Sequence, residues 1–149
     1  MGLFEAISIA GSGLDAQRIR MDVTAENLAN ADTTKAANGQ PYKRQEVQLA
    51  AVGTEGFSKA LSGAMQQGED GVPAGGVRVT GVLADNTPDQ MVYDPGSPEA
   101  NARGYVKLPN VNTVTEMTDL ISEQQSYQSD VTAMQTAKSV FNSLLGVLK

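Results

Sequence analysis

The sequence predicts an α+β protein in which long N- and C-terminal helices pair as an antiparallel coiled coil around a small β-rich domain. Apolar residues recur at steps of three and four near both ends of the chain, which predicts the two helices. Turn residues such as Asn38-Gly39 and Gly75-Gly76 separate short alternating runs in the middle, which predicts the strands. The expected division is therefore 1–32 for the first helix, 33–109 for a linker and the β domain, and 110–149 for the second helix.

The first helix is expected over Leu3–Leu28, where apolar or small residues follow one another at steps of four and three. This spacing places them along one side of a helix that needs a partner. Gly11 and Gly13 lie within this stretch, and each costs the helix up to about 1 kcal/mol relative to alanine. We expect this helix to become ordered by packing against another surface.

Four short runs in the middle of the chain are expected to form half-buried strands of one small sheet. They are Glu46–Leu49, Val77–Thr80, Met91–Tyr93 and Tyr105–Leu108. The stretch Phe57–Gln67 fits either a loop or a short helix, and its periodicity does not decide between them. A unit of about 75 residues is close to the size at which a single core becomes marginal.

The second helix carries the clearest periodic pattern and is expected to begin at Thr113. Thr113 and Glu116 have the spacing of a capping box, and Pro109 prevents a helix from starting earlier. About 37 residues at 1.5 Å each would make a rod of about 55 Å. A single chain of this size needs no helix so long, so part of its apolar stripe is expected to contact other chains.

The predicted subunit interface consists of residues at the three-and-four spacing of both helices, together with Asn27 and Asn30 near the end of the first helix. Within this set, Gln124 and Lys138 are polar interruptions of the kind that sets register and partner choice. The full set is Leu3, Ile7, Leu14, Met21, Asn27, Leu28, Asn30, Met117, Leu120, Gln124, Tyr127, Val131, Met134, Lys138, Phe141, Leu145 and Leu148.

The composition excludes several classes of function. The chain has no cysteine and no histidine, so it holds no thiolate nucleophile, zinc finger or Ser-His-Asp relay. Its net charge is −6 and no basic cluster is present, which argues against nucleic acid as a partner. We therefore expect no catalytic residue, no metal and no cofactor.

The chain shows neither a secretory signal nor a membrane-spanning stretch. The N-terminus has no basic start before an apolar run, and no stretch approaches the roughly 20 apolar residues that span a bilayer. We expect no direct membrane insertion and, if the protein leaves the cytoplasm, export without a cleaved signal peptide.

Three motifs have weak functional alternatives. Gly11-Ser12-Gly13 superficially resembles a phosphate-binding loop, but it lacks the following Gly-Lys-Ser/Thr, so close helix packing is the preferred interpretation. The segment 85–89 offers oxygens for a cation without the spaced acids of a calcium loop, so it is interpreted as an ordinary turn. Paired acids such as Glu116 and Asp119 suit a helix start better than acid–base chemistry.

The segment Ala25–Thr33 resembles the A-x-N-L-A-N-x-x-T signature shared by bacterial flagellar rod and hook proteins. Tyr42-Lys43-Arg44 is similar to the Y-K-R continuation of that family. Tyr93–Pro98 and Gly104–Asn112 resemble its proximal-rod branch in particular. The insertion Thr34–Pro41 departs from hook-type members, and longer spacing here is usual in the proximal-rod branch.

This resemblance implies a structural subunit of the proximal rod, part of a helical drive shaft that crosses the periplasm and transmits torque. It implies that the terminal helices pair in an inner coiled coil and that export uses the flagellar type III apparatus. The implied partners are copies of the chain, other rod proteins, and inner-membrane ring or export-gate adaptor proteins. Within the signature, Asn27 and Asn30 are expected to end the first helix through local hydrogen bonds, or alternatively to contact a neighbouring subunit.

Two other functions remain as alternatives. The chain could be another axial member of the flagellum, either the companion proximal-rod protein or a distal-rod protein. Less favoured is a small binding module or hydrolase whose helices enclose the β domain. Uniformly protected ends in an isolated monomer would favour this last alternative.

Overall fold

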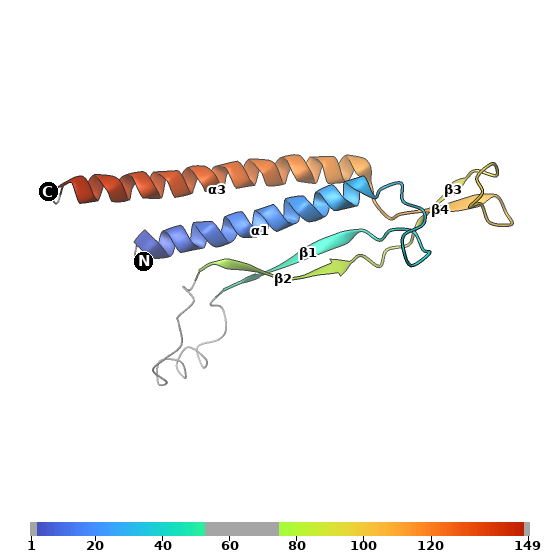
Figure 1. Cartoon of the computed structure of the whole chain (residues 1–149), viewed down its shortest axis with the longest axis horizontal. Coiled ribbons are helices and arrows are strands. Elements are labelled where there is room, and N and C mark those ends of the chain that lie inside the picture. Colours follow the sequence, from blue (N-terminus) through green and yellow to red (C-terminus); the bar gives the residue numbers. More distant parts are fainter. Residues whose placement is uncertain (1–2, 53–74, 148–149) are drawn as a thin grey trace, which may run out of the picture. The chain divides into compact units, whose positions relative to one another are not determined.

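The computed structural model describes residues 3–52 and 75–147, with the side chains of 7–52, 75–143 and 146 (Figure 1). The stretch Phe57–Gln67, which the sequence left undecided, lies outside the described residues. Helices and strands are both present, as an α+β chain requires, and no described helix is long and apolar enough to cross a membrane. The elements are α1 (Leu3–Ala29), β1 (Gln45–Ala51), β2 (Val77–Ala84), β3 (Gln90–Tyr93), β4 (Tyr105–Leu108) and α3 (Thr113–Val147).

The described strands form two separate two-stranded sheets, which corrects the expectation that they share one small sheet. β1 pairs with β2, and β3 pairs with β4 in antiparallel register. The segment between β2 and β3 explains the break. There the backbone N–H of Thr87 donates to Asp85 Oδ1 at 2.8 Å, and Pro88 has no N–H to give to a ladder.

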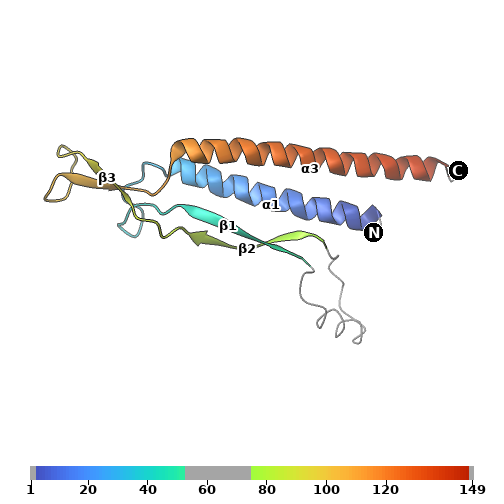
Figure 2. The same cartoon turned by 180° about the vertical axis from the view of Figure 1, so that it is seen from behind.

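The chain forms two compact units, each made of discontinuous segments. The first unit comprises Met1–Arg18, Leu49–Thr80 and Gln125–Lys149, and the second comprises Ile19–Gln48 and Gly81–Gln124. In the first unit, α1 lies between α3 and the β1–β2 pair (Figures 1 and 2). Each unit therefore combines helix with strand.

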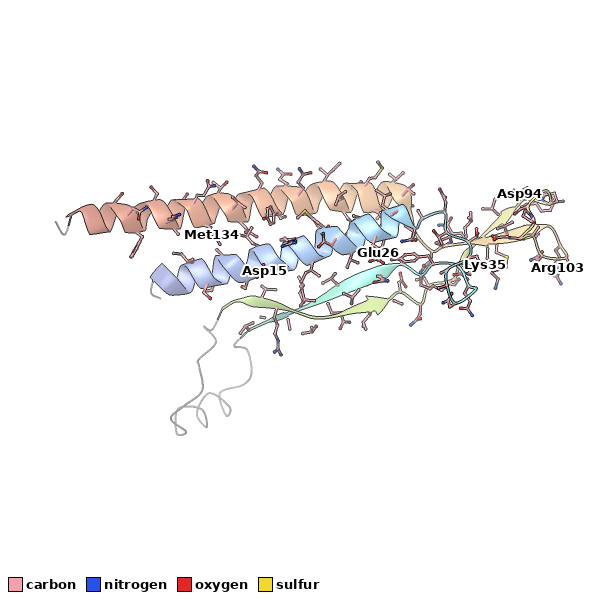
Figure 3. All side chains as sticks on the ribbon, in the orientation of Figure 1. Asp15, Glu26, Lys35, Asp94, Arg103 and Met134 are labelled. Carbon is pink, nitrogen blue, oxygen red and sulfur yellow. The ribbon has the colours of Figure 1, made fainter. Side chains whose placement is uncertain are left out.

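Small residues bring α1 close to its neighbours in the first unit. A Cβ atom at Gly11 would lie 3.9 Å from Met134 Cε, and one at Gly13 would lie 3.4 Å from Asp130 Oδ2. Figure 3 shows Met134 on α3 projecting toward α1. This close approach agrees with interpreting the glycine-rich stretch as a packing feature.

Ser12 joins α1 to the start of β2 on the other side of the helix. Its Oγ donates to the carbonyl of Ile9 at 2.7 Å and accepts the backbone N–H of Val77 at 3.1 Å. A Cβ at Gly76 would lie only 2.9 Å from that Oγ. Glycine at position 76 is therefore required for the hydroxyl to reach the strand.

The start of α3 is capped differently from the expected capping box. Asn112 Oδ1 accepts the backbone N–H groups of Val114 at 3.0 Å and Thr115 at 3.3 Å, so Asn112 is the N-cap. The Glu116 side chain does not return to the cap. It enters the buried cluster described below, which satisfies it more fully than the cap would.

β3 and β4 form a short hairpin in the second unit. Tyr93 lies opposite Tyr105, and their rings meet edge to face with centroids 5.3 Å apart. Gly104, which precedes β4, has φ +79°, and a Cβ there would lie 2.8 Å from Tyr93 Cε2. Figure 3 labels Asp94 and Arg103, which lie just outside the two strands in the connecting loop.

Candidate functional site

A buried cluster of polar side chains in the second unit connects three elements of the chain through hydrogen bonds. We call it the Asn27 junction, because Asn27 contacts most of its members and is only 1% exposed. It joins the end of α1, the start of β1 and the start of α3. Its members are Asn27, Tyr42, Arg44, Gln45 and Glu116.

Asn27 uses its whole hydrogen-bonding capacity within the chain. Its Nδ2 donates to the carbonyl of Gln45 at 2.9 Å and to Glu116 Oε2 at 3.1 Å. Its Oδ1 accepts the backbone N–H of Gln45 at 2.8 Å and the hydroxyl of Tyr42 at 3.0 Å. A primary amide can donate two hydrogen bonds and accept two, and all four are formed here. Because Asn27 bonds to both the N–H and the carbonyl of Gln45, its side chain pairs with β1 as the backbone of a neighbouring strand would.

Glu116 is buried to 1% exposure and needs a cationic partner, because an unpaired buried carboxylate is costly. Arg44 supplies that partner, with its Nε donating to Glu116 Oε1 at 2.6 Å. The same guanidinium also pairs with Glu46, and its Nη2 lies 3.9 Å from Asp119 Oδ2. Burial lowers the pKa of Arg44, but the hydrogen bonds and charges of Glu116 and Glu46 outweigh it and raise the pKa above its ordinary value.

Tyr42 closes the loop that follows α1. Its backbone N–H donates to the carbonyl of Thr33 at 3.0 Å, and Thr33 Oγ1 donates to Asn30 Oδ1 at 3.2 Å. Burial raises the pKa of the Tyr42 hydroxyl to about 12, with the nearby charges of Glu26 and Glu116 acting in the same direction. The hydroxyl therefore stays protonated and keeps donating to Asn27 at neutral pH.

Asn110 extends the junction toward the turn after β2. Its Oδ1 accepts the backbone N–H of Arg44 at 2.9 Å, and its Nδ2 donates to Thr87 Oγ1 at 2.7 Å and to the carbonyl of Asp85 at 3.2 Å. Asp85 in turn donates its N–H to the carbonyl of Arg44 at 2.7 Å. These bonds agree with interpreting the segment 85–89 as an ordinary turn.

A second buried acidic residue, Glu123, follows Glu116 further along α3. Glu123 is 8% exposed, and its Oε1 lies 3.6 Å from Arg20 Nε. Burial raises the pKa of Glu123, against the opposing effects of a hydrogen bond with Thr24 and the charge of Arg20. Its Oε2 has no hydrogen-bond partner among the described residues.

The two signature asparagines play different roles. Asn30 Nδ2 donates to the carbonyl of Glu26 at 2.9 Å, which is the local bond expected at a helix end. The expectation of a local role is wrong for Asn27, whose partners are 15, 18 and 89 residues away in the chain. Sequence reasoning also missed Arg44 and Glu116 as a pair, because spacing in the chain carries no signal for a contact across 72 residues.

The predicted interface residues fall into three groups by exposure. Half-buried are Ile7, Leu14, Met21, Leu28, Asn30, Leu120, Tyr127, Val131, Met134 and Phe141. Exposed are Met117, Gln124 and Lys138, while Asn27 is buried within the chain. Leu3 lies in α1 and Leu145 in α3, but their side chains are not described. Leu148 lies outside the described residues.

The described residues offer no evident chemistry beyond these contacts. Among them, no group of acidic side chains is arranged to hold a metal ion. An open pocket of about 340 Å³ lies between the loop that contains Thr34 and Lys35 and the segment that contains Pro98, Glu99 and Lys107. The Asn27 junction therefore has the character of a structural connection, in which the polar side chains of Asn27, Tyr42, Arg44 and Glu116 bond to one another.

Comparison with known proteins matches the same regions of the chain. The family described as "Flagella basal body rod protein" matches residues 7–36, and "Flagellar basal body rod FlgEFG protein C-terminal" matches residues 102–147. The flagellar basal-body rod protein FlgC of Bacillus subtilis is 42% identical over the full length of both chains. The FlgC protein of Borreliella burgdorferi is 38% identical over all of this chain and 99% of its own. That of Escherichia coli O157:H7 is 40% identical over 94% of this chain and 93% of its own.

The chain belongs to the FlgC family of flagellar basal-body rod proteins. As a member of the FlgC family it is a structural subunit of the bacterial flagellar basal-body rod. Both family segments contribute to the Asn27 junction, since 7–36 contains Asn27 and 102–147 contains Glu116. Within the signature, Asn27 is thus the residue that bonds the first helix to the second.

Proposed function

We propose that this chain is a subunit of the proximal rod, where many copies assemble into a helical shaft that transmits torque, and that it has no catalytic activity. The observation that carries the proposal is the Asn27 junction. It uses the signature residues of a rod family to hold α1, β1 and α3 together, and it leaves no reactive group exposed. A shaft under load needs such fixed connections between the elements of each subunit.

Within the assembled subunit, α1 and α3 pair as an antiparallel coiled coil. Contacts in each unit support this pairing. Gly11 and Gly13 approach Met134 and Asp130, whereas further along α1 Asn27 bonds to Glu116. The partner's number falls as the number in α1 rises, which is the order of an antiparallel pair. The proposed domain boundaries of the assembled subunit remain 1–32, 33–109 and 110–149.

The partners we propose are copies of this chain, the other rod proteins, and adaptor proteins at the inner-membrane ring or export gate. The proposed location is the periplasmic part of the basal body, reached through the flagellar type III apparatus without a cleaved signal peptide. Support for self-association comes from the apolar side chains that the lone chain leaves uncovered. Ile121 is 66% exposed and Val114 is 70% exposed. Water contact with such side chains costs free energy that subunit contacts would recover.

Deletion of the gene, followed by electron microscopy of basal bodies and a swimming assay, tests this proposal. The expected result is loss of the rod and of swimming, restored by the parent gene. Complementation with Val131→Asp is expected to fail, because the variant places a charge in the predicted subunit interface, whereas Ala102→Asp at an exposed loop position serves as the control. Intact rods in the deletion strain would overturn the proposal.

A further inference from the structure

Glu123 is an acidic side chain of α3 that lies against α1 outside the Asn27 junction. It is 8% exposed, and its Oε1 lies 3.6 Å from Arg20 Nε of α1. Thr24 of the same helix is also buried and is a hydrogen-bond partner of this carboxyl group. The other oxygen, Oε2, is buried and has no hydrogen-bond partner among the described residues. The ionised form of Glu123 is therefore poorly satisfied, because a buried charge needs close partners.

The acids on this side of α3 outnumber the cations that face them. They follow one another at steps of three and four and so share one side of the helix, and we call them the acidic row: Glu116, Asp119 and Glu123. Arg44 faces the first two, with its Nε 2.6 Å from Glu116 Oε1 and its Nη2 3.9 Å from Asp119 Oδ2. Arg20 faces the third. With all three acids ionised, two guanidinium groups face three carboxylates, so the acidic row lacks one positive charge.

The three acids differ in how well their charges are satisfied. Glu116 receives a hydrogen bond on each oxygen from its neighbours in the Asn27 junction. The side chain of Asp119 is 47% exposed, so water screens its charge. Glu123 has the more distant Arg20 and a buried oxygen without a partner among the described residues. The missing positive charge therefore belongs at Glu123, where a proton can be taken up from water whenever the helices part.

We infer that Glu123 makes the contact between α1 and α3 sensitive to pH: the helices close with Glu123 protonated and open more readily when it is ionised. Closing transfers one proton from water to the carboxylate of Glu123, and opening returns it. This inference concerns the single chain and goes beyond the proposed function. A chain that enters acidic surroundings accordingly holds its two helices together more firmly than it does at neutral pH.

The electrostatic surroundings of Glu123 favour the same direction. Burial raises its pKa, a hydrogen bond with Thr24 and the charge of Arg20 oppose this rise, and the charges of Asp119 and Glu116 add to it. The closed form is therefore favoured at low pH. It loses this advantage as the pH rises from the ordinary glutamate pKa through the raised one.

The composition of the chain makes this titration easy to observe. Histidine, whose ordinary pKa lies between 5 and 8, is absent from the sequence. Cysteine is absent as well, so two introduced cysteines can carry spin labels at chosen positions. Ala25→Cys on α1 and Gln124→Cys on α3 replace exposed residues, and the distance between their labels reports whether the two helices are closed.

Pulsed electron paramagnetic resonance of the dilute labelled chain tests the inference, in enough urea to open about a tenth of the molecules at pH 5. The expected open fraction at pH 7.5 is at least three times that at pH 5. Adding Glu123→Gln should reduce this change to less than 1.5-fold, whereas Glu99→Gln, at an exposed loop position, should leave it unaltered. No pH dependence in the parent, or the same dependence with Glu123→Gln, would overturn the inference.

Two further variants show whether the acidic row sets this titration. Asp119→Asn removes a negative charge beside Glu123, so the rise in the open fraction should end at a lower pH than in the parent. Arg20→Gln removes the facing cation, so the rise should extend to a higher pH. Shifts in the same direction, or no shift in either variant, would refute the inference. The proposed function is tested separately, by the presence of rods in the deletion strain.

Discussion

Asn27 and Asn30 show at the level of single residues how one residue type serves two purposes within one turn of helix. Asn30 satisfies the carbonyl of Glu26 and so ends α1. Asn27 is 1% exposed and replaces four hydrogen bonds to water with four to Gln45, Glu116 and Tyr42. Removing Asn27 leaves buried partners unsatisfied, which costs more than the loss of an exposed local bond.

We predict that Asn27→Ala lowers the free energy of unfolding by about 2–4 kcal/mol, because several buried polar groups lose their partner at once. Asn30→Ala is the matched control, and its exposed local bond predicts a loss below about 1 kcal/mol. Urea unfolding of the purified chains, followed by circular dichroism, measures both values. Equal losses for the two variants would contradict the role assigned to Asn27.

The raised pKa of Glu123 predicts that the stability of the folded chain depends on pH. Burial raises its pKa in the folded chain, so the folded state binds a proton more tightly than the unfolded state does. Its contribution to stability is therefore greatest at low pH and is lost as the pH rises from the ordinary glutamate pKa through the raised one. We predict that Glu123→Gln, which mimics the protonated form, is more stable than the parent at pH 7.

The advantage of Glu123→Gln is expected to shrink as the pH falls from the raised pKa toward the ordinary glutamate pKa, because the parent then becomes protonated, first in the folded state and then in the unfolded state. Urea unfolding of the parent and the variant at several pH values between 4 and 7 measures this difference. Glu99→Gln, at an exposed loop position, is the control and is expected to show no such trend. An advantage that stays constant with pH would argue against a raised pKa as the cause.

At the level of elements, the sequence predicted what depends on local pattern. The first helix was expected over Leu3–Leu28 and is observed over Leu3–Ala29, and each of the four expected strands lies within an observed one. Local pattern could not decide which residues of α3 lie toward α1. The apolar Met117 was the natural candidate, yet it is 54% exposed, while the neighbouring Glu116 is buried. A buried acid is stable only if a cation reaches it, and Arg44 comes from a distant part of the chain.

The cap of α3 illustrates the same limit. Thr113 and Glu116 match the capping box, but Asn112 occupies the N-cap and Glu116 is engaged in the junction. We predict that Asn112→Ala lowers the free energy of unfolding by about 1 kcal/mol, whereas Thr113→Ala changes it by less than about 0.5 kcal/mol. Thermal and urea unfolding of both variants provide the comparison. A larger loss for Thr113→Ala would restore the capping box as the correct assignment.

The β3–β4 hairpin depends on one backbone conformation. Gly104 has φ +79°, and its missing side chain leaves room for the Tyr93 ring. Gly104→Ala is predicted to lower the free energy of unfolding by about 1–3 kcal/mol, through backbone strain together with a clash. Gly39→Ala separates the two causes, because Gly39 has φ +76° with open space around it and suffers only the strain. Urea unfolding of both variants should therefore give the smaller loss for Gly39→Ala.

At the scale of the whole molecule, the chain divides its surface between contacts made within itself and contacts left for others. Ala16, Val23, Ala31, Val106 and Val111 are the buried apolar residues among those described, and all of them are small or medium in size. Larger apolar side chains such as Ile121 remain exposed. The subunit thus buries no large apolar side chain completely among the described residues and leaves apolar area for assembly, as expected of a protein that works as part of a rod.

Leu120 and Ile121 separate these two kinds of contact, because they are adjacent, equal in size and different in exposure. Leu120 is half-buried within the chain, so Leu120→Ala is predicted to lower the free energy of unfolding of the isolated chain by about 1–2 kcal/mol. Ile121 is 66% exposed, so Ile121→Ala is predicted to change that value by less than about 0.5 kcal/mol.

In cells the effect of Ile121→Ala should appear in assembly instead. The variant removes exposed apolar area that we propose is buried in subunit contacts, so fewer complete rods and slower swimming are expected although the isolated chain is as stable as the parent. Counting rods by electron microscopy beside urea unfolding of the same variant makes the comparison. If Ile121→Ala lowered the free energy of unfolding as much as Leu120→Ala does, Ile121 would belong to the fold of the single chain, and its role in subunit contacts would be refuted.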